Sequence, residues 1–141
     1  MAWTNSGRSQ SSGVSLLTTE LNSLGNGSLS AAGSAVDNDA DHDQLCDLEL
    51  AVTFGSAATA NAVVSVWFLG TVDGTNFEDG SSSVQPNRPP DAVFVCRAVT
   101  AHRVMFYGAR VPPRDFKPLL LNSSGQAFPA SGSTLKAFFY N

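Results

Sequence analysis

Residues 45–54 read LCDLELAVTF and decide the fold, because apolar and polar side chains alternate through them. The side chains that share the apolar face are Cys46, Leu48, Leu50, Val52 and Phe54. The opposite face carries Asp47, Glu49 and Thr53. This period of two with one apolar face predicts a half-buried antiparallel strand. Residues 62–69, AVVSVWFL, are apolar almost throughout, and their length and β-branched content predict a strand buried on both sides.

Further short strands are expected on either side of these two. They lie at residues 14–18, 92–99, 102–111, 115–121 and 134–140. Only two residues separate 92–99 from 102–111, a spacing that fits a hairpin. Pro118 restricts the strand at 115–121 to a sheet edge, or to a start after the proline, because proline cannot donate to a ladder. Residues 22–35 contain three glycines and are expected to form a loop.

The whole pattern amounts to about eight short strands without a convincing amphipathic helix. It predicts an all-β chain, an antiparallel β-sandwich of jelly-roll-like type, in which residues 14–141 form a single domain. Residues 1–13 carry too few apolar groups to offset the entropy of ordering, and we expect them to be a flexible N-terminal arm. Trp3 in that arm either docks on a neighbouring surface or stays disordered with the rest.

Composition excludes several classes of protein. The 141 residues carry a net charge of −4, with 43% hydrophobic and 14% charged residues. Low charge with ordinary apolar content argues against a disordered chain, and an acidic chain lacks the basic face of a nucleic-acid binder. For this reason nucleic acid is not an expected partner. A membrane is not expected either, because no apolar run approaches the length of about 18 residues that spans one. The stretch MAWTNSGRSQSSG has no apolar core, so we expect no secretory signal.

Charge is distributed unequally along the chain. Residues 1–80 hold ten acids and one base, whereas residues 81–141 hold seven bases and two acids. If strands from both halves interleave, these charges mix in space. Alternatively, acidic and basic patches face each other across copies of the chain and orient their association.

No catalytic set, cofactor motif or metal-ligand set emerges from the sequence, and we expect no enzyme. The run Asp37–Asp43 lacks the Gly and Glu of an EF-hand, which leaves a different calcium site or a solvated lead-in to the next strand. His102 lies near Asp91 across the expected hairpin, although a surface histidine is the simpler interpretation. Two buried thiols are preferred over a disulfide for Cys46 and Cys96.

Two arginines are candidate interface residues together with Trp3. Arg110 and Arg114 flank Pro112-Pro113, and their guanidinium groups can contact an acidic partner in bidentate fashion. The alternative for either residue is a solvated loop.

Residues 45–141 resemble small structural proteins encoded among the virion genes of tailed bacteriophages, of the head-associated decoration or cement kind. The segments that carry the resemblance are Asp73-Gly74-Thr75-Asn76, Pro112-Pro113 followed by Phe116-Lys117, Asn122 with Gly125, and Ala130-Ser131-Gly132 with Thr134-Leu135. The resemblance implies a β-sandwich without enzymatic activity, often trimeric, on the capsid surface. Its partner would be the major capsid protein, and it would be made in the host bacterial cytoplasm. A tail or baseplate component, or an adhesin that binds host glycans through Trp3, Tyr107 or Tyr140, is the alternative.

Overall fold

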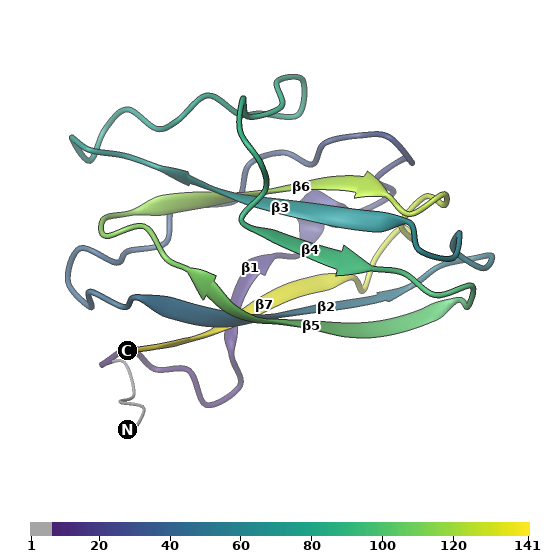
Figure 1. Ribbon diagram of the computed structural model, residues 1–141, viewed down its shortest axis with the longest axis horizontal. Coiled ribbons are helices and arrows are strands. Elements are labelled where there is room, and N and C mark those ends of the chain that lie inside the picture. The colour runs from purple at the N-terminus through teal and green to yellow at the C-terminus, as the bar shows by residue number, and fades with distance from the viewer. Residues whose placement is uncertain (1–6) are drawn as a thin grey trace.

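The computed structural model describes residues 7–141 and shows two antiparallel sheets packed face to face (Figure 1). This arrangement confirms the predicted all-β sandwich. The strands are β1 (Val14–Leu17), β2 (Leu45–Thr53), β3 (Val63–Gly70), β4 (Ala92–Val95), β5 (Ala101–Arg110), β6 (Phe116–Ser123) and β7 (Thr134–Tyr140). One turn of 3₁₀ helix, Thr19–Leu21, follows β1.

The strand order is β1-β7-β2-β5 in the four-stranded sheet and β4-β3-β6 in the three-stranded sheet. Every neighbouring pair in both sheets is antiparallel. The register of β2 places Leu50 opposite Leu135 of β7 on one side and Val104 of β5 on the other. These apolar residues project toward the second sheet, as the alternation in residues 45–54 predicts.

An eighth, irregular strand position is occupied by residues 29–36. This segment forms isolated bridges to β6 at Leu29 and Val36. Between the bridges, the Gly33 backbone N–H donates to the Pro118 carbonyl at 2.8 Å. Residues 22–35 contain no regular strand, as expected for a loop, but their second half pairs irregularly with β6.

With this segment counted as a strand, the chain pairs in a nested order. β1 pairs with β7, residues 29–36 pair with β6, β2 pairs with β5, and β3 pairs with β4. A long antiparallel hairpin that is rolled over on itself gives this nesting, which is the jelly-roll arrangement.

The position of β6 in its sheet explains why this strand tolerates Pro118. β6 is the last regular strand of its sheet, as expected for a strand that contains proline. Because the Pro118 carbonyl bonds to Gly33, its missing N–H also faces that irregular segment and not β3. Gly33 crosses Pro118 so closely that a Cβ at this residue would lie 2.7 Å from the proline Cγ and 2.9 Å from the Leu16 carbonyl oxygen.

We expect Gly33→Ala to destabilise the protein by about 1–3 kcal/mol, because the added methyl group overpacks a site closed by backbone and a proline ring. Gly55→Ala is the matched control, since nothing lies within 4 Å of a Cβ at that position. It should change stability by no more than about 0.5 kcal/mol. Urea denaturation of the two variants measures the difference, and equal midpoints would contradict the close approach.

The two sheets differ in how their outer faces are covered. All six residues from Val64 to Leu69 in β3 are buried, which confirms a strand buried on both sides. The side chains of Trp67, Leu69 and Leu119 form a small second core, packed against Leu29 and Ala32 of the irregular segment. By contrast, β2 alternates between buried and half-exposed residues along almost its whole length. The outer face of the four-stranded sheet is therefore open to solvent.

The expected hairpin between residues 92–99 and 102–111 is wrong. Among the described strands, β4 pairs only with β3 and β5 only with β2, so residues 96–100 carry the chain from one sheet to the other. The His102 side chain closes this corner, because the Arg97 backbone N–H donates to its Nε2 atom at 3.1 Å. The short connection between β4 and β5 therefore crosses from one sheet to the other and does not form a hairpin, because each strand pairs within its own sheet.

Candidate interaction surface

The open face is the outward side of β7, β2 and β5. Its charged members are Asp47, Glu49, Arg103 and Lys136, and its large apolar members are Met105, Tyr107 and Phe138. These three apolar side chains are 39%, 72% and 42% exposed, respectively. Large side chains with this exposure on one face offer contact area to a partner.

Strand register sets the pattern of the open face. Glu49 of β2 lies between Met105 of β5 and Lys136 of β7, and Asp47 lies opposite Phe138. Carboxylates therefore run along the middle strand, with apolar and basic side chains on both sides. The same residues line a hollow of about 480 Å³, which residues 10–13 border.

Both carboxylates of the middle strand are already bonded within the fold. Arg103 Nη1 donates to Glu49 Oε1 at 2.7 Å. The Asp47 Oδ1 atom accepts from the Gly108 backbone N–H and from the Tyr140 hydroxyl, each at 2.9 Å. Burial, followed by the nearby Asp47 carboxylate, raises the pKa of Tyr140 to about 12. These bonds fix the positions of the two carboxylates on the open face.

A bulge shapes the end of β5 beside Asp47. The register between β2 and β5 shifts between Cys46 and Leu48, opposite Gly108. Gly108 has a φ of 72°, a left-handed conformation that favours glycine. Tyr107 directly precedes this glycine, and its side chain is 72% exposed.

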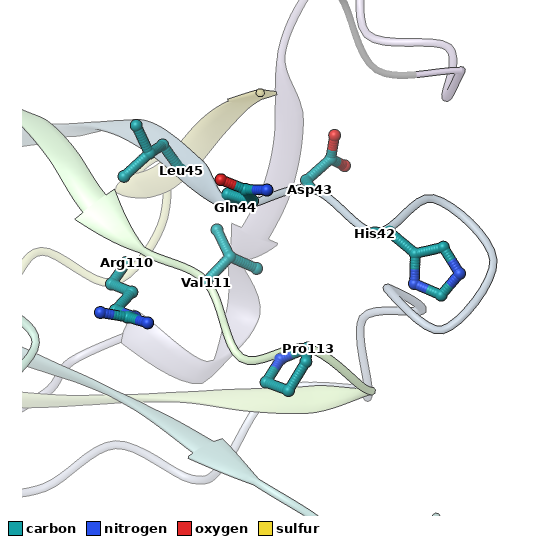
Figure 2. A pocket seen from close by; sticks show the side chains of 7 residues that line it. All are labelled: His42, Asp43, Gln44, Leu45, Arg110, Val111 and Pro113. Atoms are coloured by element: carbon teal, nitrogen blue, oxygen red, sulfur yellow. The ribbon is translucent and has the colours of Figure 1, made fainter.

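A second hollow, of about 660 Å³, lies where β5 leaves the four-stranded sheet (Figure 2). Val111 and Pro113 lie between His42 and Arg110, whose side chains are at opposite ends of the group of lining residues. The described residues that line it bring no acid, base and nucleophile together, because the Asp43 carboxylate is buried against Arg8. Arg110, a predicted interface residue, is exposed beside this hollow.

The other two predicted interface residues do not join Arg110 at one site. Arg114 donates to the Val72 carbonyl at 2.9 Å and lies 3.4 Å from the Asp39 carboxylate, so it ties loops together. Trp3 lies outside the described residues. Met105 and Phe138 were not selected from the sequence, although the alternation in HRVMFY and TLKAFF places both on the polar side of their strands.

The acidic run is organised around buried Asn38. The Asn38 Nδ2 atom donates to the carbonyls of Asp43 and Pro112, and its Oδ1 atom accepts from the Asp43 backbone N–H. Asp37 Oδ1 accepts from the backbone N–H of Asp39 at 3.0 Å. Among the described residues, no group of three or more His, Cys, Asp or Glu side chains is placed to hold a metal ion.

Arg8 reaches the same region from the expected arm. Its guanidinium contacts Asp43 at 2.9 Å and Asp41 at 3.4 Å, and lies 4.2 Å above the centre of the Phe139 ring. The side chain of Asp43 is fully buried, and that of Arg8 is 12% exposed. Nearby, the Gln10 side chain donates to and accepts from the Phe139 backbone. Residues 7–13 of the expected arm therefore lie against β7, and residues 1–6 lie outside the described range.

Replacing Arg8 should be costly. We expect Arg8→Ala to destabilise the fold by about 3–5 kcal/mol, because it leaves the buried Asp43 carboxylate without its countercharge. Asp39→Ala is the matched control, since it removes an exposed contact with Arg114 and should cost less than about 1 kcal/mol. Chemical denaturation measures both values. A cost for Arg8→Ala as small as that of the control would show that the ion pair is not a structural anchor.

His102 and Asp91, considered as a pair from the sequence, do not contact each other. His102 is buried and contacts the backbone of Arg97, and its ring packs edge-on against Phe54. Asp91 instead accepts the Phe68 backbone N–H at 2.7 Å and an Arg88 N–H at 3.0 Å. The simpler interpretation of His102 as a surface residue is wrong as well, since its ring closes a buried corner.

Arg88 is a structural residue that the sequence did not single out. Its guanidinium bonds to both oxygens of Glu78, to Asp91 and to the Phe68 carbonyl. The hydrogen bonds with Glu78 contribute most to raising the pKa of Arg88 above its usual range. The Arg88 carbonyl also accepts the Trp67 indole N–H at 3.0 Å. Arg88 thereby fastens the long connection between β3 and β4 over the outer face of the three-stranded sheet.

Ion pairs join the two halves of the sequence. Glu49, Glu78 and Asp39 come from the acidic half, and they pair with Arg103, Arg88 and Arg114 of the basic half. Interleaved strands bring these charges together within one copy, as the first of the two sequence interpretations states.

Cys46 and Cys96 are both free and buried. Burial, followed by the nearby Asp47 charge, raises the pKa of the Cys46 thiol to about 12. Burial also raises the pKa of the Cys96 thiol. The two thiols thus act as small apolar groups of the core.

Stability should fall as the pH rises from 9 to 12. Cys46 and Tyr140 have ordinary pKa values of 9.0 and 10.0, and each is raised to about 12 in the fold. The unfolded chain therefore loses these protons first, so the stability they contribute is complete below pH 9 and is lost as pH approaches 12. Melting temperatures measured across this range check the decline. Cys46→Ala and Tyr140→Phe should each make the decline of melting temperature with pH shallower. An unchanged decline in both variants would contradict this prediction.

Comparison of the chain with protein-family models, with curated proteins and with solved structures gave no match. Within residues 7–141, none of the helical structure is long and apolar enough to cross a membrane.

Proposed function

We propose that this chain is a non-enzymatic structural protein of a bacteriophage virion that binds the outer surface of the capsid and cements neighbouring capsomers. Its partner in this proposal is the major capsid protein, and its place is the capsid surface after synthesis in the host bacterium. The resemblance of residues 45–141 to decoration proteins supports the proposal, as does the jelly-roll fold, which is common among viral capsid domains.

The open face is the observation that carries the proposal. One sheet is covered on both sides, whereas the other leaves Met105, Tyr107 and Phe138 in solvent. Asp47 and Glu49 between them accept hydrogen bonds from within the fold. A partly apolar, solvent-exposed face fits a binding role. Repetition on a lattice can raise its apparent affinity by roughly 10²–10⁴ without new contacts per subunit.

Purified protein should bind expanded heads that lack it and raise their melting temperature. Phe138→Glu should weaken this binding at least about tenfold, because an aromatic contact in the centre of an interface is replaced by a charge. Val72→Glu is the matched control and should bind normally, since Val72 is 93% exposed on the connection that follows β3. Co-sedimentation with heads and calorimetry measure the two effects. Wild-type protein that neither binds nor shifts the melting temperature would overturn the proposal.

A host-glycan-binding adhesin, or another tail or baseplate component, is the second candidate. Tyr107 and Phe138 stand on the open face, and the Tyr140 hydroxyl is bonded to Asp47 beside them. Aromatic rings next to carboxylates can stack on sugars and accept their hydroxyl hydrogen bonds, and the jelly roll is also a lectin fold. Clear hits on a glycan array, lost in Tyr107→Ala, would favour this function over capsid binding.

A further inference from the structure

β5 is the longest unpaired edge in the described part of the chain. It ends the four-stranded sheet, and Figure 1 shows it along the margin of the molecule. It has ten residues, whereas the other regular edge strands β1 and β4 have four each. The outer side of β6 is taken by residues 29–36. A long free edge is a template for pairing with another strand.

The backbone groups that face outward from β5 follow from its register. Leu50 pairs with Val104, and Val52 with His102. The Phe54 N–H donates to the Thr100 carbonyl, so Phe54 and Thr100 form a pair that is bonded across the strands. Hydrogen-bonded pairs recur at every second residue of an antiparallel ladder, and the even-numbered residues of β5 therefore bond to β2. The N–H and C=O groups of Arg103 and Met105 point to the free edge.

Side chains at this edge are incompletely covered on both faces. Val104 and Phe106 face the core but are only partly buried. Met105 and Tyr107 are exposed on the open face. The edge thus leaves apolar surface above and below the free backbone groups, which is the surface that one added strand would cover.

We propose that β5 pairs antiparallel with β5 of a second copy of this chain, about a twofold axis at Met105. The two Met105 residues then lie opposite each other as a hydrogen-bonded pair. Arg103 lies opposite Tyr107 of the second copy, where its guanidinium can stack on the ring with the Asp47 carboxylate beyond it. On the inner face, Val104 lies opposite Phe106 of the second copy, and β-branched residues pair favourably with aromatic ones.

Charge and backbone shape disfavour the two other registers that would place an outward-facing residue of β5, Arg103 or Tyr107, on the twofold axis. A twofold axis at Arg103 would place two guanidinium groups directly opposite each other, which is unfavourable. An axis at Tyr107 would place Phe106 opposite Gly108, whose φ of 72° belongs to the bulge that interrupts the regular strand. The register at Met105 avoids both, with the regular residues Val104–Phe106 at its centre and the bulge residues Tyr107 and Gly108 toward its ends.

The resulting dimer has one continuous eight-stranded sheet, with both open faces on the same side. This inference rests on the edge of β5 and stands whether or not the protein binds a capsid. It also differs from the homotrimer that the phage resemblance implies, and the oligomeric state decides between them.

Sedimentation velocity of the full chain tests the inference. Wild-type protein should form a dimer that dissociates on dilution. Met105→Asp should raise the dissociation constant at least tenfold, because two carboxylates would meet at the axis. Phe138→Glu is the matched control, since it changes the same open face away from β5, and it should remain dimeric. A wild-type monomer at all concentrations, or a trimer, would overturn the inference.

Cross-linking tests the register. Met105→Cys should form a covalent dimer on mild oxidation, because hydrogen-bonded pairs hold Cα atoms about 5.5 Å apart, within the range of a disulfide. Arg103→Cys should not, since residue 103 faces residue 107 of the second copy. The native thiols are buried and serve as the internal background in both variants. Cross-linking of Arg103→Cys, or its absence in Met105→Cys, would overturn the proposed axis.

Discussion

Apolar packing between the two sheets is the constraint on which the structure depends. The largest fully buried side chains include Phe68 and Phe94 of the three-stranded sheet, Phe139 of the four-stranded sheet, and Phe116, whose ring centre lies 4.7 Å from that of Phe68. Each sheet contributes one face to this core. The sheets differ in their outer faces. Residues 29–36 and the connection fastened by Arg88 cover the outer face of the three-stranded sheet and leave that of the four-stranded sheet open. No segment within residues 7–141 covers the outer side of β7, β2 and β5, and this side is the open face.

Much of this arrangement could be predicted from the pattern of residues. Alternation in residues 45–54 and the apolar run at 62–69 identified a one-sided and a two-sided strand, and Pro118 correctly marked an edge. Partner choice could not be predicted, because spacing along the chain does not report which strands share a sheet. Residues 92–111 are an example, since they make a corner where a hairpin was expected.

The candidate surface was harder to predict than the fold. Trp3, Arg110 and Arg114 were selected for their chemical type, whereas Met105 and Phe138 belong to the surface because of the strand face they occupy. Long-range contacts such as Arg8 with Asp43 leave no local signal either, because a charged residue in a polar segment looks like any solvated group until its partner is known. Exposure on a face is a property of the assembled sheet, and it follows only once register and neighbours are known.

The position of β7 has a consequence for biosynthesis. This strand is formed by residues 134–140, yet it lies between β1 and β2 in the interior of its sheet. A nascent chain emerging from the ribosome can pair β3 with β4 once residues 63–95 have been made, but among the described strands β1 has no partner until residues 134–140 follow. Such distant pairing slows folding and leaves strand edges uncovered in the meantime. Removal of residues 134–140 would separate β1 from β2, because β7 is the strand that lies between them.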